Sequence, residues 1–242
     1  MASPRVALFV TCMVDQVVPE TGIAAVKLLE AAGCEVAFPD AQSCCGQPAL
    51  SAGEPEAAAR LARHFVEVFE PFDAVVAPSG SCAAMVRHWY DRLLDGPDRT
   101  RALAVADKAY ELGEYLVDVL GRTDLGARVD ATVTVHDACH GLRNLGVKDA
   151  PRRLLEHAGA RIVEMTEPET CCGFGGTFAV KHGEVAGSLA DDKLTHAATT
   201  DADYLVSGDS ACLAHLEGRR RRTANGPRLV HYAQLLADGL QT

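Results

Sequence analysis

The triplets Cys44-Cys45-Gly46 and Cys171-Cys172-Gly173 are two copies of one motif, one in each half of the chain. Each triplet belongs to a set of four cysteines. The first set is Cys12, Cys44, Cys45 and Cys82, and the second set is Cys139, Cys171, Cys172 and Cys212. The first three members of the two sets share one constant offset, and the last pair has a slightly longer one. Four thiolates that converge from distant points of a chain describe a metal or cluster site, so the sequence predicts two inorganic centres.

The repeat extends beyond the cysteines. Leu28-Leu29-Glu30 returns as Leu154-Leu155-Glu156, and Ser79-Gly80-Ser81-Cys82 has a looser counterpart that ends at Cys212. Duplication of one α/β unit accounts for both similarities. The alignment places Cys34 opposite Ala160, outside either set. We therefore interpret Cys34 as a small buried hydrophobic side chain.

Composition limits the class of protein. The chain has 242 residues, is 48% hydrophobic and carries a net charge of −10, which argues against nucleic acid as a partner. The apolar run at 6–14 is too short to span a bilayer and lacks a small-residue cleavage site, so we expect no membrane insertion and a cytoplasmic location. In that reducing compartment, metal ligation explains nine cysteines better than disulfides do.

Strand and helix patterns alternate in both halves. Strands are expected at 6–10, 36–38, 74–77, 132–135, 162–165 and 204–206. Helices are expected at 23–32, 55–69, 151–159 and 184–198, and one more short strand and helix within 229–240. This order predicts an α/β fold of two duplicated halves, each with a small parallel sheet flanked by helices.

The predicted boundaries are a first cysteine-rich half at 1–100, a connecting helix at 101–127 and a second cysteine-rich half at 128–242. Every cysteine of each set follows the carboxyl end of an expected strand. Because parallel strands end at the same edge of a sheet, each set should converge where open α/β sheets place their ligands.

Zinc and iron–sulfur clusters are the competing occupants. Structural zinc sites usually pair their ligands as C-x₂₋₄-C, a spacing that these two sets lack. Adjacent cysteines suit a cluster with several irons better than one tetrahedral ion, and the following glycine lets backbone amides turn toward the sulfurs. We favour iron–sulfur clusters over zinc.

The pattern Cys12-x31-Cys44-Cys45-x36-Cys82, with its partner Cys139-x31-Cys171-Cys172-x39-Cys212, resembles the CCG, or cysteine-rich domain, family. That family includes the cysteine-rich subunit of heterodisulfide reductase and the iron–sulfur subunits of glycolate oxidase and anaerobic glycerol-3-phosphate dehydrogenase. The chain is most similar to its lactate utilization branch. The motifs that carry this similarity are Phe9-Val10-Thr11-Cys12, Cys44-Cys45-Gly46-Gln47-Pro48, Ser79-Gly80-Ser81-Cys82 and Cys171-Cys172-Gly173-Phe174-Gly175-Gly176-Thr177-Phe178.

The resemblance implies an iron–sulfur electron-transfer subunit of an L-lactate-oxidising complex, without independent activity. Its partners would be proteins B and C of the same system, and its cofactors up to two [4Fe–4S] clusters bound by the eight cysteines. One departure concerns the C-x-x-C end of the motif in heterodisulfide reductase. Here the fifth positions are Met85 and His215, which favours four-cysteine centres over a fused cluster with five cysteines. Two positions stay open for His215, three residues after Cys212: a ligand of the second centre, or an exposed turn of a helix.

Two other functions stay open. One is a thiol or disulfide reductase of the heterodisulfide reductase type, and the other is a scaffold stabilised by zinc. Around the second set, His136 and His140 can tune a centre or serve in packing, while Asp137 and Asp209 can lower its potential or cap helices. The run Arg219-Arg220-Arg221-Arg222 is interpreted as a solvated loop rather than a docking patch.

Overall fold

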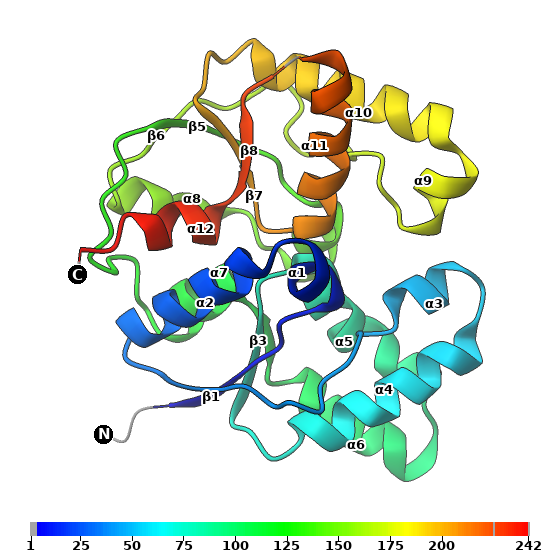
Figure 1. Ribbon diagram of the computed structural model, residues 1–242. Coiled ribbons are helices and arrows are strands. Elements are labelled where there is room, and N and C mark those ends of the chain that lie inside the picture. Colours follow the sequence, from blue (N-terminus) through cyan, green and yellow to red (C-terminus); the bar gives the residue numbers. More distant parts are fainter. Residues whose placement is uncertain (1–3, 225, 242) are drawn as a thin grey trace.

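The structure is a computed structural model that describes residues 4–224 and 226–241. Its frame is two four-stranded parallel sheets (Figure 1). The first has the order β2-β1-β3-β4, built from Arg5–Leu8 (β1), Glu35–Ala37 (β2), Ala74–Ala77 (β3) and Ala109–Glu111 (β4). The second has the order β6-β5-β7-β8, built from Thr132–Val135 (β5), Arg161–Ile162 (β6), Tyr204–Ser207 (β7) and Arg228–His231 (β8). The predicted fold of two duplicated α/β halves is confirmed.

Helices cover the outer face of each sheet. On the first sheet they are α4 (Pro55–Phe69), α5 (Gly80–Leu93) and α6 (Gly96–Ala106), and on the second α10 (Gly183–Ala198) and α11 (Ser210–Thr223). The first outer core is aromatic, since the ring of Phe9 packs edge-on against Phe65 at 4.9 Å and Phe69 at 5.6 Å. Apolar burial of this kind stabilises each half.

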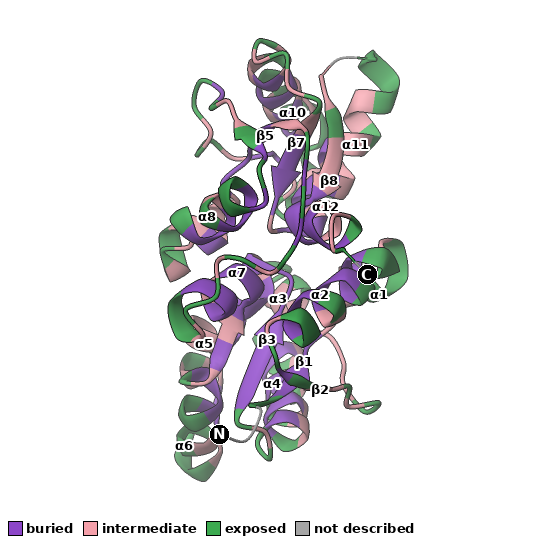
Figure 2. Ribbon diagram, turned by 90° about the vertical axis from the view of Figure 1, so that its left-hand side faces the viewer, coloured by how far each residue is buried: buried purple, intermediate pink, exposed green. Residues whose placement is uncertain are grey.

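A layer of helices lies between the two sheets (Figure 1). The first half contributes α2 (Pro19–Ala31), the short α7 (Leu112–Glu114) and the π-helical turn η1 (Tyr115–Val119), and the second half α8 (Asp149–His157) and α12 (Tyr232–Asp238). Leu28, Leu116, Leu154 and Leu236 from these elements belong to one buried cluster. The two halves therefore share a core, and Figure 2 shows their buried residues facing inward while green, exposed surfaces face outward.

The strands β4 and β8 enter this inner layer in the same way. Glu111 ends β4 and caps α7, and His231 ends β8 and caps α12, each in a capping box. The hydroxyl of Tyr232 then donates a hydrogen bond to Glu111 Oε1 at 2.6 Å. Because all these groups are buried, the contact joins the halves at a fixed orientation.

Two expectations were wrong at the level of secondary structure. Residues 101–127 do not form one connecting helix: they contain the end of α6, then β4, α7 and η1, and then an irregular segment. The three residues of β4 pair with β3, and that tertiary contact outweighs local helical spacing. The arginine run lies in helix α11, not in a loop, where Arg220 and Arg221 pair with Glu217 one turn earlier.

Four short helices carry the cysteine loops: α1 (Cys12–Val17), α3 (Gln47–Ser51), η2 (Gly141–Leu145) and α9 (Thr177–Lys181). Within the described part of the chain, none of the helices is both long enough and apolar enough to cross a membrane.

Candidate metal centres

The first set of cysteines gathers beyond the carboxyl edge of the first sheet. Cys12 follows β1 and opens α1, the Cys44-Cys45 pair follows β2, and Cys82 lies in the first turn of α5 after β3. Cys12 Sγ is 3.6 Å from Cys44 Sγ, and Cys45 Sγ is 3.5 Å from Cys82 Sγ. The structure thus brings together four side chains that are far apart in sequence.

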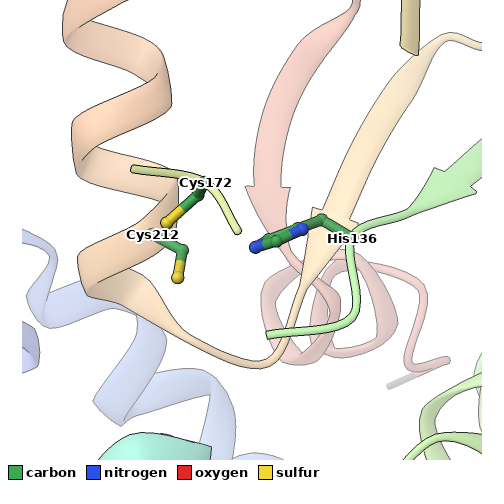
Figure 3. A group of neighbouring side chains, drawn as sticks. All are labelled: His136, Cys172 and Cys212. Carbon is green, nitrogen blue, oxygen red and sulfur yellow. The ribbon is translucent and has the colours of Figure 1, made fainter. Parts of the chain in front are cut away.

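The second set repeats this arrangement. Cys139 follows β5, Cys171-Cys172 follow β6, and Cys212 lies in the first turn of α11 after β7. Cys172 and Cys212 form a group with His136 in which one ligand atom from each residue lies within 4.8 Å of the others (Figure 3). All three side chains are buried.

The backbone conformation at the third position of each triplet explains why that residue is glycine. Gly46 and Gly173 adopt φ angles of +88° and +92°, which glycine tolerates best. In this conformation the Gly46 amide donates to Cys44 Sγ at 3.5 Å, and the Gly173 amide donates to Cys171 Sγ at 3.3 Å. A Cβ atom on Gly173 would lie only 2.4 Å from the carbonyl oxygen of Ala186.

These contacts give the cysteines of each set different pKa values. Hydrogen bonds from Cys12 and Cys45, together with the Gly46 amide, hold the pKa of Cys44 well below its usual value despite its burial. Cys171 has a lowered pKa for the same reasons, with Cys139 and Cys172 as the donors. Cys12 and Cys139 have raised pKa values, because each donates to that neighbour and both are partly desolvated. One sulfur per set is therefore a preferred thiolate.

A single cavity of about 410 Å³ connects the two sets. Seven of the eight motif cysteines line it: Cys12, Cys45, Cys82, Cys139, Cys171, Cys172 and Cys212. The halves meet beside it, where Ser79 and Asp209 form an antiparallel bridge and Asp209 Oδ2 accepts a hydrogen bond from the Ser81 amide at 3.0 Å. The sequence predicted two crevices, whereas the structure joins them into one.

The donors present fit a thiophilic metal or cluster. Each half offers four sulfurs at one place, a backbone amide directed at one of them, and cavity space in front. Soft thiolate sets of this kind select zinc or iron–sulfur clusters over hard cations. The ligand set of eight cysteines remains a prediction.

Other candidate residues have ordinary partners. Cys34 lies in the core cluster between the sheets, away from both sets, as interpreted from the sequence. Met85 is buried in the outer core of the first half, in the cluster that contains Phe9 and Phe65. The ring of His215 lies within hydrogen-bonding distance of Ala186 O, at 3.2 Å. Asp209 caps α11, and Arg152 donates to both oxygens of Asp137.

One nearby residue escaped the sequence analysis. Lys193, in the middle of α10, is 1% exposed, and its Nζ donates to the carbonyl oxygens of Glu167 and Pro168. Burial lowers its pKa to about 8, against the nearby thiols and carboxylates, which raise it. The sequence signal for its burial is helical spacing, because Lys193 shares a helix face with Ala190 and Ala197. His140, by contrast, lines the cavity and contacts Gln47 of the first half at 3.2 Å.

Comparison with known proteins agrees with the cysteine pattern. The cysteine-rich (CCG) domain family matches residues 6–87 and 133–217. Lactate utilization protein A of Macrococcus caseolyticus is 45% identical over 98% of this chain and 98% of its own length. The protein of that name from Geobacillus sp. is 43% identical over 96% of this chain and 98% of its length.

A solved structure shares the fold at low sequence identity. A hypothetical protein from Helicobacter pylori superimposes with a TM-score of 0.71 over 100% of this chain at 9% identity, and this chain spans 50% of that protein's length. The family matches cover both copies of the motif, and the lactate utilization relatives align over nearly the whole chain. The chain therefore belongs to the cysteine-rich (CCG) domain family, in the group that contains lactate utilization protein A.

Proposed function

We propose that this chain is an iron–sulfur electron-transfer subunit of an L-lactate-oxidising system. The observation that carries the proposal is the convergence of two four-cysteine sets on one cavity between the duplicated halves. The names of the relatives supply the metabolic context, lactate utilization. When bound, iron–sulfur clusters supply one-electron redox chemistry, and the protein positions and tunes them.

The chain's own residues have three tasks in this proposal. The eight motif cysteines would hold the clusters, Cys12, Cys44, Cys45 and Cys82 in the first half and Cys139, Cys171, Cys172 and Cys212 in the second. The amides of Gly46 and Gly173 direct hydrogen bonds at a sulfur of each set, which favours its charged form. The bridge at Ser79 and Asp209 fixes the two sets relative to one another.

Lactate oxidation itself would require the partners, proteins B and C of the same system. In the described part of the chain, the cavity has no arginine or lysine in its lining to bind a carboxylate. We therefore expect no lactate oxidation by the purified chain in an anaerobic assay with an artificial electron acceptor. Activity should appear when the candidate partners are added.

Matched cysteine variants sharpen this assay. Cys45→Ser should abolish the reconstituted activity, while Cys34→Ser, outside both sets, should retain it. Robust lactate oxidation by the chain alone would refute the electron-transfer role, and so would equal activity with both variants.

A thiol or disulfide reductase is the second candidate, favoured by the cavity itself. Its lining includes Met13, Pro48, Phe174 and Val180 beside the cysteines, which suits an apolar thiol substrate. In such an enzyme, added thiol should change the EPR spectrum of the oxidised, cluster-loaded protein. We expect no change, because in the electron-transfer proposal each centre is bound by protein ligands alone and takes no substrate thiol.

A zinc-stabilised scaffold has one observation in its favour. The sulfur separations of 3.5 and 3.6 Å approach the spacing of roughly 3.8 Å between ligands of one tetrahedral zinc ion. Anaerobically purified protein that is colourless and carries zinc in place of iron would support the scaffold and contradict our proposal. A brown protein that absorbs at about 400 nm would exclude the scaffold.

A further inference from the structure

His136 is a buried histidine without a hydrogen-bond partner. The residue is 1% exposed. Neither Nδ1 nor Nε2 makes a hydrogen bond of normal distance and angle to a described residue, and the carbonyl oxygen of Pro168 lies near the ring without completing one. Buried polar side chains are almost always paired, because an unpaired one loses its hydration without compensation. His196 and His231 each have one such nitrogen, whereas His136 has both, which points to a further binding partner for this ring.

The place of the ring identifies the kind of partner. A ring nitrogen of His136 lies within 4.8 Å of Cys172 Sγ and Cys212 Sγ, and Figure 3 shows the ring extending from the chain just after β5 toward these thiols. The backbone around it is fixed by the sheet: the His136 amide donates to Val206 O at 2.8 Å, and Ser207 Oγ donates to His136 O at 3.0 Å. The sheet, rather than a side-chain partner, sets the direction of the ring.

The first half has no such group at the equivalent place. The offset in the repeat that relates Cys12 to Cys139 also places Phe9 opposite His136. Phe9 is 1% exposed and packs edge-on against Phe65. The histidine is thus a specific difference between two otherwise similar centres.

The glycine contacts extend this comparison to the outer helices. A Cβ atom on Gly46 would meet Ala58 and Leu61 of α4, and one on Gly173 would meet Ala186 and Leu189 of α10. The number of residues from Ala58 to Ala186 equals the number from Leu61 to Leu189, so α4 and α10 align at one constant offset. That offset also relates Phe65 to Lys193.

The second half therefore replaces two packed phenyl rings with an imidazole and an ammonium group. His136 and Lys193 are each 1% exposed. Burial of such polar groups costs free energy unless each one has a hydrogen-bond or ligand partner. The ammonium of Lys193 donates to the carbonyl oxygens of Glu167 and Pro168, whereas neither nitrogen of the imidazole completes a hydrogen bond to a described residue. Packing alone does not account for this exchange.

We infer that His136 is a fifth protein ligand of the second centre and binds a metal atom there through a ring nitrogen. This inference rests on the proposed function, in which the second cysteine set holds an iron–sulfur centre. Imidazole nitrogen and thiolate sulfur ligate at about 2.1 and 2.3 Å, so donors within 4.8 Å of one another can share a metal atom after small movements.

The test measures ligation directly. Protein labelled with ¹⁵N at histidine would be purified anaerobically, reduced with dithionite and studied by pulsed EPR. We expect a strong coupling to one directly bound imidazole nitrogen in wild type. It should vanish in His136→Phe, which restores the residue type of the first half. The matched control His215→Gln, which alters a histidine bonded to Ala186 O, should retain it.

The possible results separate the two claims. Wild-type protein without iron or labile sulfide would overturn the proposed function and this inference with it. Wild-type protein with clusters but no strong nitrogen coupling, or with a coupling that persists in His136→Phe, would overturn the inference alone. The labelled wild type decides the question even if His136→Phe fails to fold. In a folded variant, an unchanged signal from the first centre shows that the substitution acts locally.

Discussion

At the residue scale, the two sets and the isolated cysteine should respond differently to substitution. We expect Cys45→Ser and Cys172→Ser each to lose about half of the bound iron, because each removes one ligand of one centre. Cys34→Ser should keep the full content, since Cys34 packs between the sheets among apolar side chains. Iron and labile-sulfide analysis measures this outcome. A loss in Cys34→Ser as large as in the paired variants would contradict the division into sets.

The glycine of the second triplet offers a further residue-scale test. Gly173→Ala should destabilise the second centre, because its Cβ would lie 2.4 Å from a backbone oxygen. Gly33 is the matched control: its φ is +90°, close to the +92° of Gly173, but a Cβ there would meet nothing within 4 Å. The left-handed backbone costs either alanine about 1–2 kcal/mol, but only Gly173→Ala adds the clash.

Iron content and urea unfolding of the two variants measure the difference. Gly173→Ala should lose iron, while Gly33→Ala should keep its iron and lose only stability. Equal iron content in both variants would show that the close approach at Gly173 has no role in shaping the centre.

Sequence reasoning found the cysteines because their spacing repeats, yet it could not rank their neighbours. The sequence shows that His136 lies three residues before Cys139, but its two unpaired nitrogens depend on what surrounds the ring in space. Lys193 was missed because its burial follows from the way α10 packs against the loop at Glu167. Properties that depend on contacts between distant segments have no local signal.

At the element scale, the junction of β4 and α7 with α12 predicts a pH-dependent stability. Burial raises the pKa of Glu111 to about 7 from the usual 4.5, against the hydrogen bonds from Tyr232, Glu114 and Gly113, which lower it. The folded protein therefore holds this proton more tightly than the unfolded chain does. Its contribution to the unfolding free energy is fully present below pH 4.5 and is lost as the pH rises to about 7.

Substitution tests this assignment. Glu111→Gln, which has no proton to lose, should lack this decline when urea unfolding is followed across the range from pH 4.5 to about 7. Tyr232→Phe keeps the carboxyl group but removes a hydrogen bond that favours its charged form, so it should retain or enlarge the decline. The same slope in wild type and Glu111→Gln would assign the pH dependence to another group.

Elements with a strong local pattern were predicted well, and those formed by tertiary contact were not. The helix at 55–69 and the strands at 74–77 and 132–135 have the expected bounds. The strand β4 has only three residues, too short for an alternating pattern to be recognised, and it forms because β3 offers an edge beside it. The π-helical turn after it likewise has no sequence signature that distinguishes it from an ordinary helix.

At the scale of the whole molecule, duplication placed the two cysteine sets but did not reveal how they face one another. The sequence predicts two similar halves, whereas their relative orientation depends on the shared helical layer and on the bridge at Ser79 and Asp209. That orientation creates one cavity of about 410 Å³ in place of two crevices. In the proposed function, this arrangement would place both centres beside one cavity of a single subunit.

The central claim is that this chain holds two iron–sulfur centres, one on each set of four cysteines. Iron, zinc and acid-labile sulfide analysis of anaerobically purified protein, combined with EPR of the reduced form, tests it most directly. The account predicts about eight irons and eight sulfides per chain, with signals from two inequivalent centres. Zinc at the cysteine sets without labile sulfide, or iron that stays bound when Cys45 and Cys172 are both replaced by serine, would contradict it.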